Sequence, residues 1–239
     1  MPTRRALLLI ADIGGYTEYM QFHRSVLGHA EAATSRMLDR IVDAAKGFEL
    51  IEIEGDAAFL SRDADGLEGP EALAVITDAA VAMHRAFHAE RRFVELNMCP
   101  CGSCTQTSGL KLKFVAHVGE VATQTIRRRK KLVGLDVIYV HRLLKNTVTV
   151  PEYLLVSDDL FQNGGTTSTE LRVHQIAQDL EDIGPVQTFY VDVQDMTGPV
   201  AGLPEPSLLL RIGATLDMVG RGLPHVLPHR RPRPLTPAG

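Results

Sequence analysis

Apolar residues in the first part of the chain change from a strand-like run to a helical spacing. The continuous apolar run over residues 5–12 predicts a buried strand. Residues 25–46 carry apolar side chains three or four positions apart, which predicts an amphipathic helix with Ser25 as its cap. The apolar face of this helix consists of Val26, Ala30, Ala33, Met37, Ile41 and Ala44.

The same change from strand to helix then occurs a second time. Residues 48–54 and 57–62 predict two strands, and Gly55 permits a tight reversal between them. A second helix is predicted from Pro70 to about Arg92, because apolar residues again recur at helical spacing. Its apolar face consists of Leu73, Ile76, Ala80, Met83 and Phe87.

The second half of the chain contains shorter elements that follow an insertion. Residues 97–108 hold all the cysteines and are predicted to form an inserted loop. Alternating polarity predicts a strand over residues 110–118, and the segment GEVATQTI, residues 119–126, is expected to turn back as its partner. A third helix fits residues 135–146, and the segments YLLVS and QTFYVDV read as further strands.

This order of elements predicts an α+β fold with helices packed on one face of a sheet. The succession of strand, helix, strand, strand, helix and strand is that of a ferredoxin-like βαββαβ core, here with additional C-terminal strands and a helix. We expect one domain over residues 1–197. Prolines punctuate residues 198–239, which predicts a partly flexible basic tail with one short amphipathic helix over residues 207–219.

The composition fits a single globular domain and argues against several classes of function. The 239 residues are 45% hydrophobic, which is enough to form a full core. A net charge of −4 argues against general binding of nucleic acids or membrane surfaces. No apolar run approaches the ~20 residues that span a bilayer, and no signal peptide is expected. The three cysteines are too few and too clustered for a secreted disulfide framework, so we expect a cytoplasmic protein.

Two aspartates stand at the ends of apolar segments and form the strongest candidate site. Asp12 ends the first predicted strand, and Asp56 follows Gly55 between the next two. Carboxylates at strand ends can bind a hard cation that keeps other positions for water or phosphate oxygens. Gly14 and Gly15 would let the backbone approach a ligand closely. The alternative is that each aspartate is an ordinary turn residue, which needs no ligand.

The cysteine segment is a second candidate metal site. Cys99, Cys101 and Cys104 suit a structural zinc ion, since thiolates are preferred zinc ligands, but a tetrahedral site needs a fourth ligand. His84, His88 or a cysteine of a second protomer could supply it. The alternative is three reduced thiols in an exposed loop. A further histidine, His117, is predicted to be a packed strand residue with no ligand role.

Four motifs in order resemble the class III nucleotidyl cyclases. ADIGGYTEYM is similar to the family's D-I-x-G-[FY]-T segment, and EIEGDAAFL is similar to its G-D hairpin. AHVGEV resembles the H-x-G-x-V hairpin, and LVGLDVIYVHRLLKN resembles the G-x-x-V-N-x-A-x-R helix. The resemblance covers roughly residues 5–195. The chain also looks close to a bacterial cyclase-like family of uncharacterised function that carries a cysteine-rich insert.

This resemblance implies a chemistry and an assembly. Asp12, Asp56 and the backbone carbonyl of Ile13 would hold two divalent ions, Mg²⁺ or Mn²⁺. One ion would lower the pKa of the ribose 3′-hydroxyl of a purine nucleoside triphosphate, and the other would brace the triphosphate during in-line attack on the α-phosphorus. A cyclic nucleotide and pyrophosphate would leave. Such sites form between two head-to-tail protomers, so the resemblance implies a homodimer.

Four positions test how far the resemblance extends. The base-reading positions fall on Glu52, the residue type that guanylate cyclases have there, and on Lys131, which matches neither adenylate nor guanylate cyclases. Arg142 matches the arginine that steadies charge on the α-phosphate. The ribose-orienting asparagine, however, falls on Ile138, which offers no hydrogen bond. The sequence therefore predicts either a weak or divergent cyclase, or a degenerate homologue that serves as a nucleotide-binding, dimerisation or signalling module.

The basic run over residues 127–131 could collect around a triphosphate, but five successive cations are more often a solvated loop. We therefore expect these side chains to be solvated. The phosphate-binding lysine that cyclases supply late in the domain has no counterpart that we can place.

Overall fold

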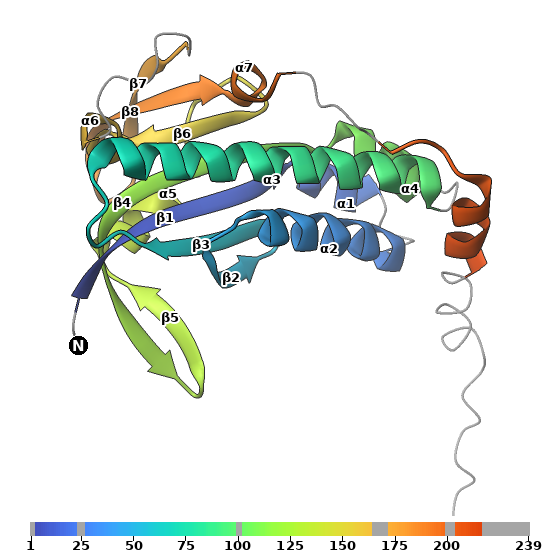
Figure 1. The fold of residues 1–239 in the computed structure, drawn as a ribbon, viewed down its shortest axis with the longest axis horizontal. Coiled ribbons are helices and arrows are strands. Elements are labelled where there is room, and N and C mark those ends of the chain that lie inside the picture. The colour runs from blue at the N-terminus through green and yellow to red at the C-terminus, as the bar shows by residue number, and fades with distance from the viewer. Residues whose placement is uncertain (1–2, 23–26, 99–101, 164–171, 199–203, 217–239) are drawn as a thin grey trace, which may run out of the picture.

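The computed structural model describes residues 3–22, 27–98, 102–163, 172–198 and 204–216 as one mixed sheet with helices on both of its faces (Figure 1). The strand order is β2-β3-β1-β4-β6-β8-β7, and β5 pairs with β4 outside this path. The strands are β1 Thr3–Gly14, β2 Glu49–Glu54, β3 Ala57–Asp63, β4 Lys111–Ile126, β5 Arg129–Val133, β6 Tyr153–Ser157, β7 His174–Leu180 and β8 Gly184–Asp192.

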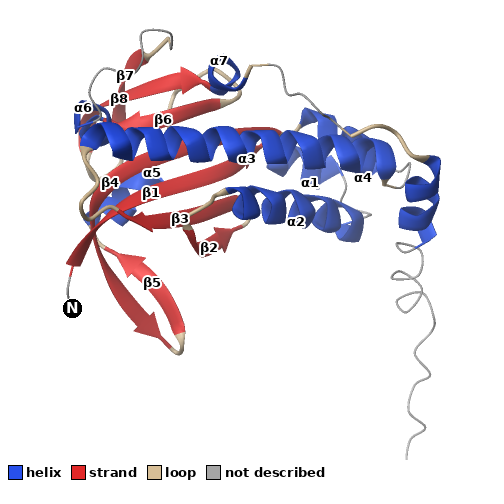
Figure 2. Ribbon diagram, in the orientation of Figure 1, coloured by secondary structure: helices blue, strands red, loops and turns tan. Residues whose placement is uncertain are grey.

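The helices differ widely in length, and the two longest belong to the predicted core (Figure 2). They are α1 Tyr16–Phe22, α2 Leu27–Ala44, α3 Gly69–Asn97, α4 Gly102–Thr105, α5 Leu135–Leu143, α6 Asp158–Asn163 and α7 Val193–Thr197, with a 3₁₀ turn η2 over Gln106–Gly109. Among the described residues, no helix is both long enough and apolar enough to cross a membrane.

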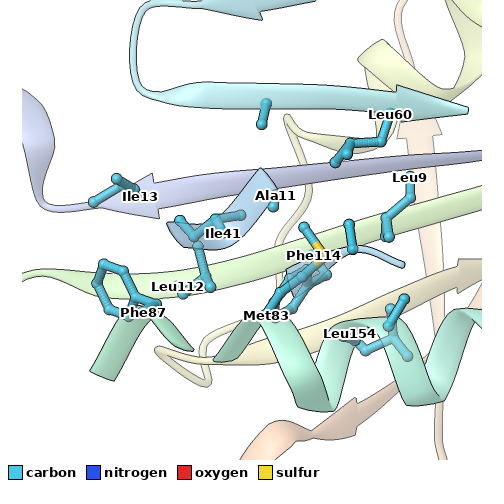
Figure 3. Close-up of a cluster of buried hydrophobic side chains, with 14 of the residues drawn as sticks. Leu9, Ala11, Ile13, Ile41, Leu60, Met83, Phe87, Leu112, Phe114 and Leu154 are labelled. Carbon is cyan, nitrogen blue, oxygen red and sulfur yellow. The ribbon is translucent and has the colours of Figure 1, made fainter. Parts of the chain in front are cut away.

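The predicted ferredoxin-like core is confirmed. The elements β1, α2, β2, β3, α3 and β4 follow in that order, and β1 pairs antiparallel with both β3 and β4. One face of the sheet packs against α2 and α3 through a continuous apolar cluster, part of which Figure 3 shows. Its fully buried members include Leu9 and Ile13 of β1, Met83 and Phe87 of α3, and Phe114 of β4.

The second face of the sheet is also covered, which corrects the prediction that the helices pack on one face. Val140 and Leu143 of α5 are buried against Ala6, Leu8 and Ile10 of β1 on the side opposite α2 and α3. The difference arises because β1 is apolar at successive positions and not only at alternate ones. Both faces of the strand therefore need cover, and the short α5 supplies it on the second side.

The predicted reversal after residue 118 does not occur. β4 continues to Ile126, and the chain turns at Arg127 and Arg128, whose φ angles are 47° and 74°. Gly119 serves close packing instead of a turn: a β-carbon there would overlap the Asp136 carboxyl group. That carboxylate accepts a 2.6 Å hydrogen bond from the Glu120 backbone N–H, so α5 is fastened to the middle of β4.

Three smaller differences separate the predicted elements from those of the structure. The predicted helix over residues 25–46 is α2, which begins at Leu27 in the described part of the chain, and its predicted cap Ser25 lies outside the described residues. The strand β7 was not predicted because its sequence, HQIAQDL, is mostly polar and exposed at the edge of the sheet. Part of the predicted cysteine loop folds into α4 and η2.

The beginning of the proline-rich segment packs against the domain. Residues 208–216 are helical, inside the range predicted for a short helix. The Ser207 backbone N–H donates to Asn97 Oδ1 at 2.6 Å, and Asn97 Nδ2 donates to the Glu205 carbonyl at 3.1 Å. This segment is therefore joined to the C-terminal end of α3.

We predict that Gly119→Ala destabilises the protein by about 1–3 kcal/mol, because the added methyl group must displace Asp136 from β4. The free energy of unfolding from urea denaturation measures the effect. Gly28→Ala in α2 is the matched control, since nothing lies within 4 Å of the position that its added β-carbon would take, and this change should be neutral or slightly stabilising. Equal stability of the two variants would contradict the packing role of Gly119.

Candidate functional site

The structure brings Asp12 and Asp56 to the same place at the end of β1. Leu9 and Ala11 of β1 face α2 and α3, so the alternation of the strand turns Asp12 toward the α5 side. Asp56 lies in the turn between β2 and β3, where Gly55 has the left-handed φ of 64°. The Ile13 backbone N–H donates to the Asp56 carbonyl at 3.1 Å, which fastens this turn to the end of β1.

The two carboxylates interact electrostatically. Partial burial raises the pKa of Asp56, and the negative charge of Asp12 raises it further. Lys113 of β4 contributes the compensating charge: its ammonium lies 2.9 Å from Asp12 Oδ2. Burial lowers the pKa of Lys113, but the ion pair with Asp12 and the charges of Tyr153 and Asp56 together outweigh burial, so the net shift is upward. The carboxylates of Asp12 and Asp56 thus have one ammonium group, that of Lys113, between them, so this end of β1 carries a net negative charge.

Lys113 and Tyr153 are parts of this site that the sequence analysis missed. Tyr153 is buried at the start of β6, and its hydroxyl donates to Asn146 Oδ1 at 3.0 Å. Burial raises the pKa of Tyr153, and the charges of Lys113 and Asp12 also act on it. The alternating segment LKLKFV did indicate that a lysine would project from β4. That this lysine contacts Asp12 follows only from the strand register, which places Lys113 opposite Asp12.

The two predicted base-reading positions meet within one chain. Lys131 Nζ lies 3.1 Å from Glu52 Oε2, which joins β5 to β2. Next to this pair is a cleft of about 400 Å³ between β2, β3 and β5, lined among others by Leu50, Ile51 and Lys131. Lys131 and Glu52 are both partly exposed, so their polar groups can reach a ligand.

The predicted helix residues do not join this site in the single chain. The Arg142 guanidinium donates to Glu181 and to Asp182 Oδ2 in the turn between β7 and β8. Among the described residues, no hydrogen bond or ion pair joins Arg142 to Asp12 or Asp56. Ile138 is 50% exposed on the surface of α5.

His117 and the basic hairpin have the surroundings that the sequence predicted for them. His117 is buried, with Nδ1 2.8 Å from Ser157 Oγ and Nε2 3.1 Å from Asp136 Oδ1, which confirms a packed strand histidine. Burial lowers its pKa although Asp136 acts to raise it. In the basic hairpin, Arg127, Arg128, Lys130 and Lys131 are exposed, as expected of a solvated run.

Only Cys104 of the three cysteines in the predicted zinc site lies among the described residues. Cys99 and Cys101 lie outside the described residues, and Cys104 is buried in the core cluster beside α2 and α3. His84 and His88, which were considered as a fourth zinc ligand, lie instead beside Glu152 in a group that does not include Cys104. The thiolate site therefore stays a prediction.

Comparison with known structures identifies the fold. The guanylyl cyclase Cya2 has a TM-score of 0.57 and 19% identity, with 87% of this chain and 96% of that chain covered. The guanylate cyclase domain of RhGC from Catenaria anguillulae, solved in complex with GTP, has a TM-score of 0.55 and 16% identity over 80% of this chain and 98% of that one. The adenylyl cyclase CyaB from P. aeruginosa has a TM-score of 0.51 and 15% identity, covering 80% and 96%.

Comparison of sequences identifies the family. The model of the family described as "Protein of unknown function (DUF2652)" matches residues 34–153. The uncharacterized protein Rv2561/Rv2562 of Mycobacterium tuberculosis is 36% identical over 194 residues, which cover 81% of this chain and 88% of that protein. The chain therefore belongs to the DUF2652 family, and it has the fold of class III nucleotidyl cyclase domains.

Proposed function

We propose that this protein binds a purine nucleoside triphosphate together with Mg²⁺ or Mn²⁺ at Asp12 and Asp56, and that it is a weak or divergent nucleotidyl cyclase. The observation that carries the proposal is the pair of interacting carboxylates at the end of β1, within a cyclase fold. Carboxylate repulsion of this kind is relieved by a bound cation.

The donor set fits the proposed metal. Carboxylate and carbonyl oxygens are the ligands that Mg²⁺ and Mn²⁺ prefer. Ile13 follows Asp12 directly and its N–H bonds the Asp56 backbone, so its carbonyl is the proposed third donor. Lys113 neutralises only one of the two carboxylates. Bound metal ions supply charge stabilisation of the triphosphate and activation of the ribose hydroxyl. Asp12 and Asp56 would determine where the metal charge lies, and Glu52 and Lys131 would contact the base.

The Glu52 and Lys131 pair favours guanine. A carboxylate can accept hydrogen bonds from guanine N1–H and N2–H together, and the lysine ammonium can donate to O6. Adenine has no second donor on the ring edge that would match the carboxylate in this way. We therefore propose GTP as the preferred substrate, with Glu52 and Lys131 as the groups that contact the base.

A homodimer completes the proposed site. Arg142 is engaged by Glu181 and Asp182 within its own chain, and a head-to-tail partner would place its own α5 against Asp12 and Asp56. Because Ile138 cannot orient the ribose, we expect a rate about 10²–10³ below that of a complete cyclase site. The same observations favour a second candidate function, a nucleotide-binding or dimerisation module without turnover.

Incubation with GTP or ATP and Mn²⁺ should yield a cyclic nucleotide and pyrophosphate, more from GTP, as measured by mass spectrometry. Asp56→Asn should lower the yield at least about 100-fold, because it removes a metal ligand. Asp43→Asn, an exposed aspartate of α2, is the matched control and should leave the yield unchanged. Nucleotide binding that needs Mn²⁺ and Asp56 but yields no product would favour the module. Binding that is indifferent to Asp12 and Asp56 would contradict both versions.

Lys113→Met should tighten Mn²⁺ binding about fivefold, or roughly 1 kcal/mol, because it removes the ammonium that competes for Asp12. Isothermal titration with Mn²⁺ alone measures this dissociation constant. Lys46→Met, at an exposed position, serves as the control and should bind Mn²⁺ like the wild type. Weaker Mn²⁺ binding by the Lys113 variant would show that Asp12 is not a ligand.

A further inference from the structure

A second cluster of ligating side chains lies on the other face of β4, between α3 and the start of β6. His84 and His88 are one turn apart on α3, so both imidazole rings project from the same face of the helix. Glu152, immediately before β6, reaches between them. All three ligating atoms lie within 4.8 Å of one another, and the side chains of His84 and Glu152 are each only 3% exposed.

Hydrogen bonds alone cannot account for this arrangement. His88 Nε2 lies 3.0 Å from His84 Nε2 and 2.9 Å from Glu152 Oε1, and His84 Nε2 lies 3.3 Å from Glu152 Oε2. An imidazole nitrogen has one in-plane direction, occupied by either a proton or a lone pair, so it forms one hydrogen bond. Each Nε2 here has two close polar contacts. With Glu152 as a carboxylate, which can only accept, every placement of protons on the two imidazoles leaves two like groups close together in a buried place.

A metal ion satisfies all three atoms at once. Zinc binds imidazole nitrogens and carboxylate oxygens at about 2.0–2.2 Å, and tetrahedral geometry then holds neighbouring donor atoms about 3.3 Å apart. The two nitrogens lie 3.0 Å apart, and each lies 2.9 or 3.3 Å from its nearer oxygen of the Glu152 carboxylate, so the separations are close to that value. We propose that His84 Nε2, His88 Nε2 and the Glu152 carboxylate bind one Zn²⁺ ion, at a site separate from the carboxylates of Asp12 and Asp56.

The fourth ligand would come from a cleft beside α7. This cleft, of about 510 Å³, is lined by His84, His88 and Glu152 on one side and by α7 residues, among them Asp195, on the other. Helices α3 and α7 are in contact, and α7 lies at the end of β8, beside β6 (Figure 1). A water molecule in this cleft can therefore complete a tetrahedral set.

The surroundings favour a structural ion over a hydrolytic one. Zinc proteases of the H-E-x-x-H type carry their general base immediately after the first histidine. Here that position is Arg85, whose guanidinium donates to the Thr197 carbonyl at 3.0 Å. Glu152 also accepts a 3.0 Å hydrogen bond from the Leu112 backbone N–H. The ion would thus fasten α3 to both β4 and β6.

Metal analysis of the full chain, purified without a histidine tag, tests the proposal. After dialysis against Zn²⁺ and then metal-free buffer, the wild type should retain about one Zn²⁺ per chain. His88→Gln and Glu152→Gln should each weaken Zn²⁺ binding at least about tenfold, because each removes a ligand. The matched control His174→Gln, an exposed histidine of β7, and Asp56→Asn should both retain the ion.

X-ray absorption of the Zn²⁺-loaded wild type provides a test that does not depend on whether the variants fold. Nitrogen and oxygen scatterers at about 2.0 Å, without sulfur, are expected. Sulfur scatterers at about 2.3 Å would overturn the proposal and assign the ion to the cysteine segment. Failure of the wild type to retain Zn²⁺, or equal retention by the folded His88→Gln and control variants, would also overturn it.

Discussion

The pairing of β1 along both of its edges, with apolar cover on both of its faces, is the constraint on which the rest of the molecule depends. β3 and β4 take up its backbone hydrogen-bonding groups, and Leu7, Leu8, Leu9 and Ile10 are at most 1% exposed. A strand held in this way cannot slip by one residue without exchanging its two apolar faces. The positions of α2 and α3 on one side and of α5 on the other follow from this fixed register.

The same register determines the electrostatics at the end of the strand. Asp12 is the first charged residue after the buried run, and it lies opposite Lys113 on one neighbour and Ala57 on the other. The turn that carries Asp56 is short because Gly55 adopts a left-handed conformation. The backbone thereby holds the two acidic residues beside each other, which distinguishes this end of β1 from an ordinary acidic loop.

The sequence predicted those parts of the site that follow from local pattern. Asp12 and Asp56 were selected as candidates because each stands at the end of an apolar run, whereas His84 and His88 were considered only as alternative fourth ligands of a cysteine zinc site. Lys113 and Glu152 were not assigned, because their partners are distant in sequence. Glu152 meets a histidine 68 residues away only after β6 has joined the sheet beside β4. Residues 119–126 were expected to turn back, because the close packing of Gly119 against Asp136 leaves no local signature in the sequence.

The parallel pairing of β4 with β6 brings residues 112–113 close to residues 152–153, and in each pair one residue belongs to one candidate site and its neighbour to the other. Leu112 hydrogen-bonds Glu152 on the α3 side, while the next residues, Lys113 and Tyr153, belong to the Asp12 region on the α5 side. A rotation of either peptide unit would move groups in both places. If metal binding at one site tilts this strand pair, it would also change the metal affinity of the other site. Thermodynamic reciprocity then requires the change in binding free energy to be equal in both directions.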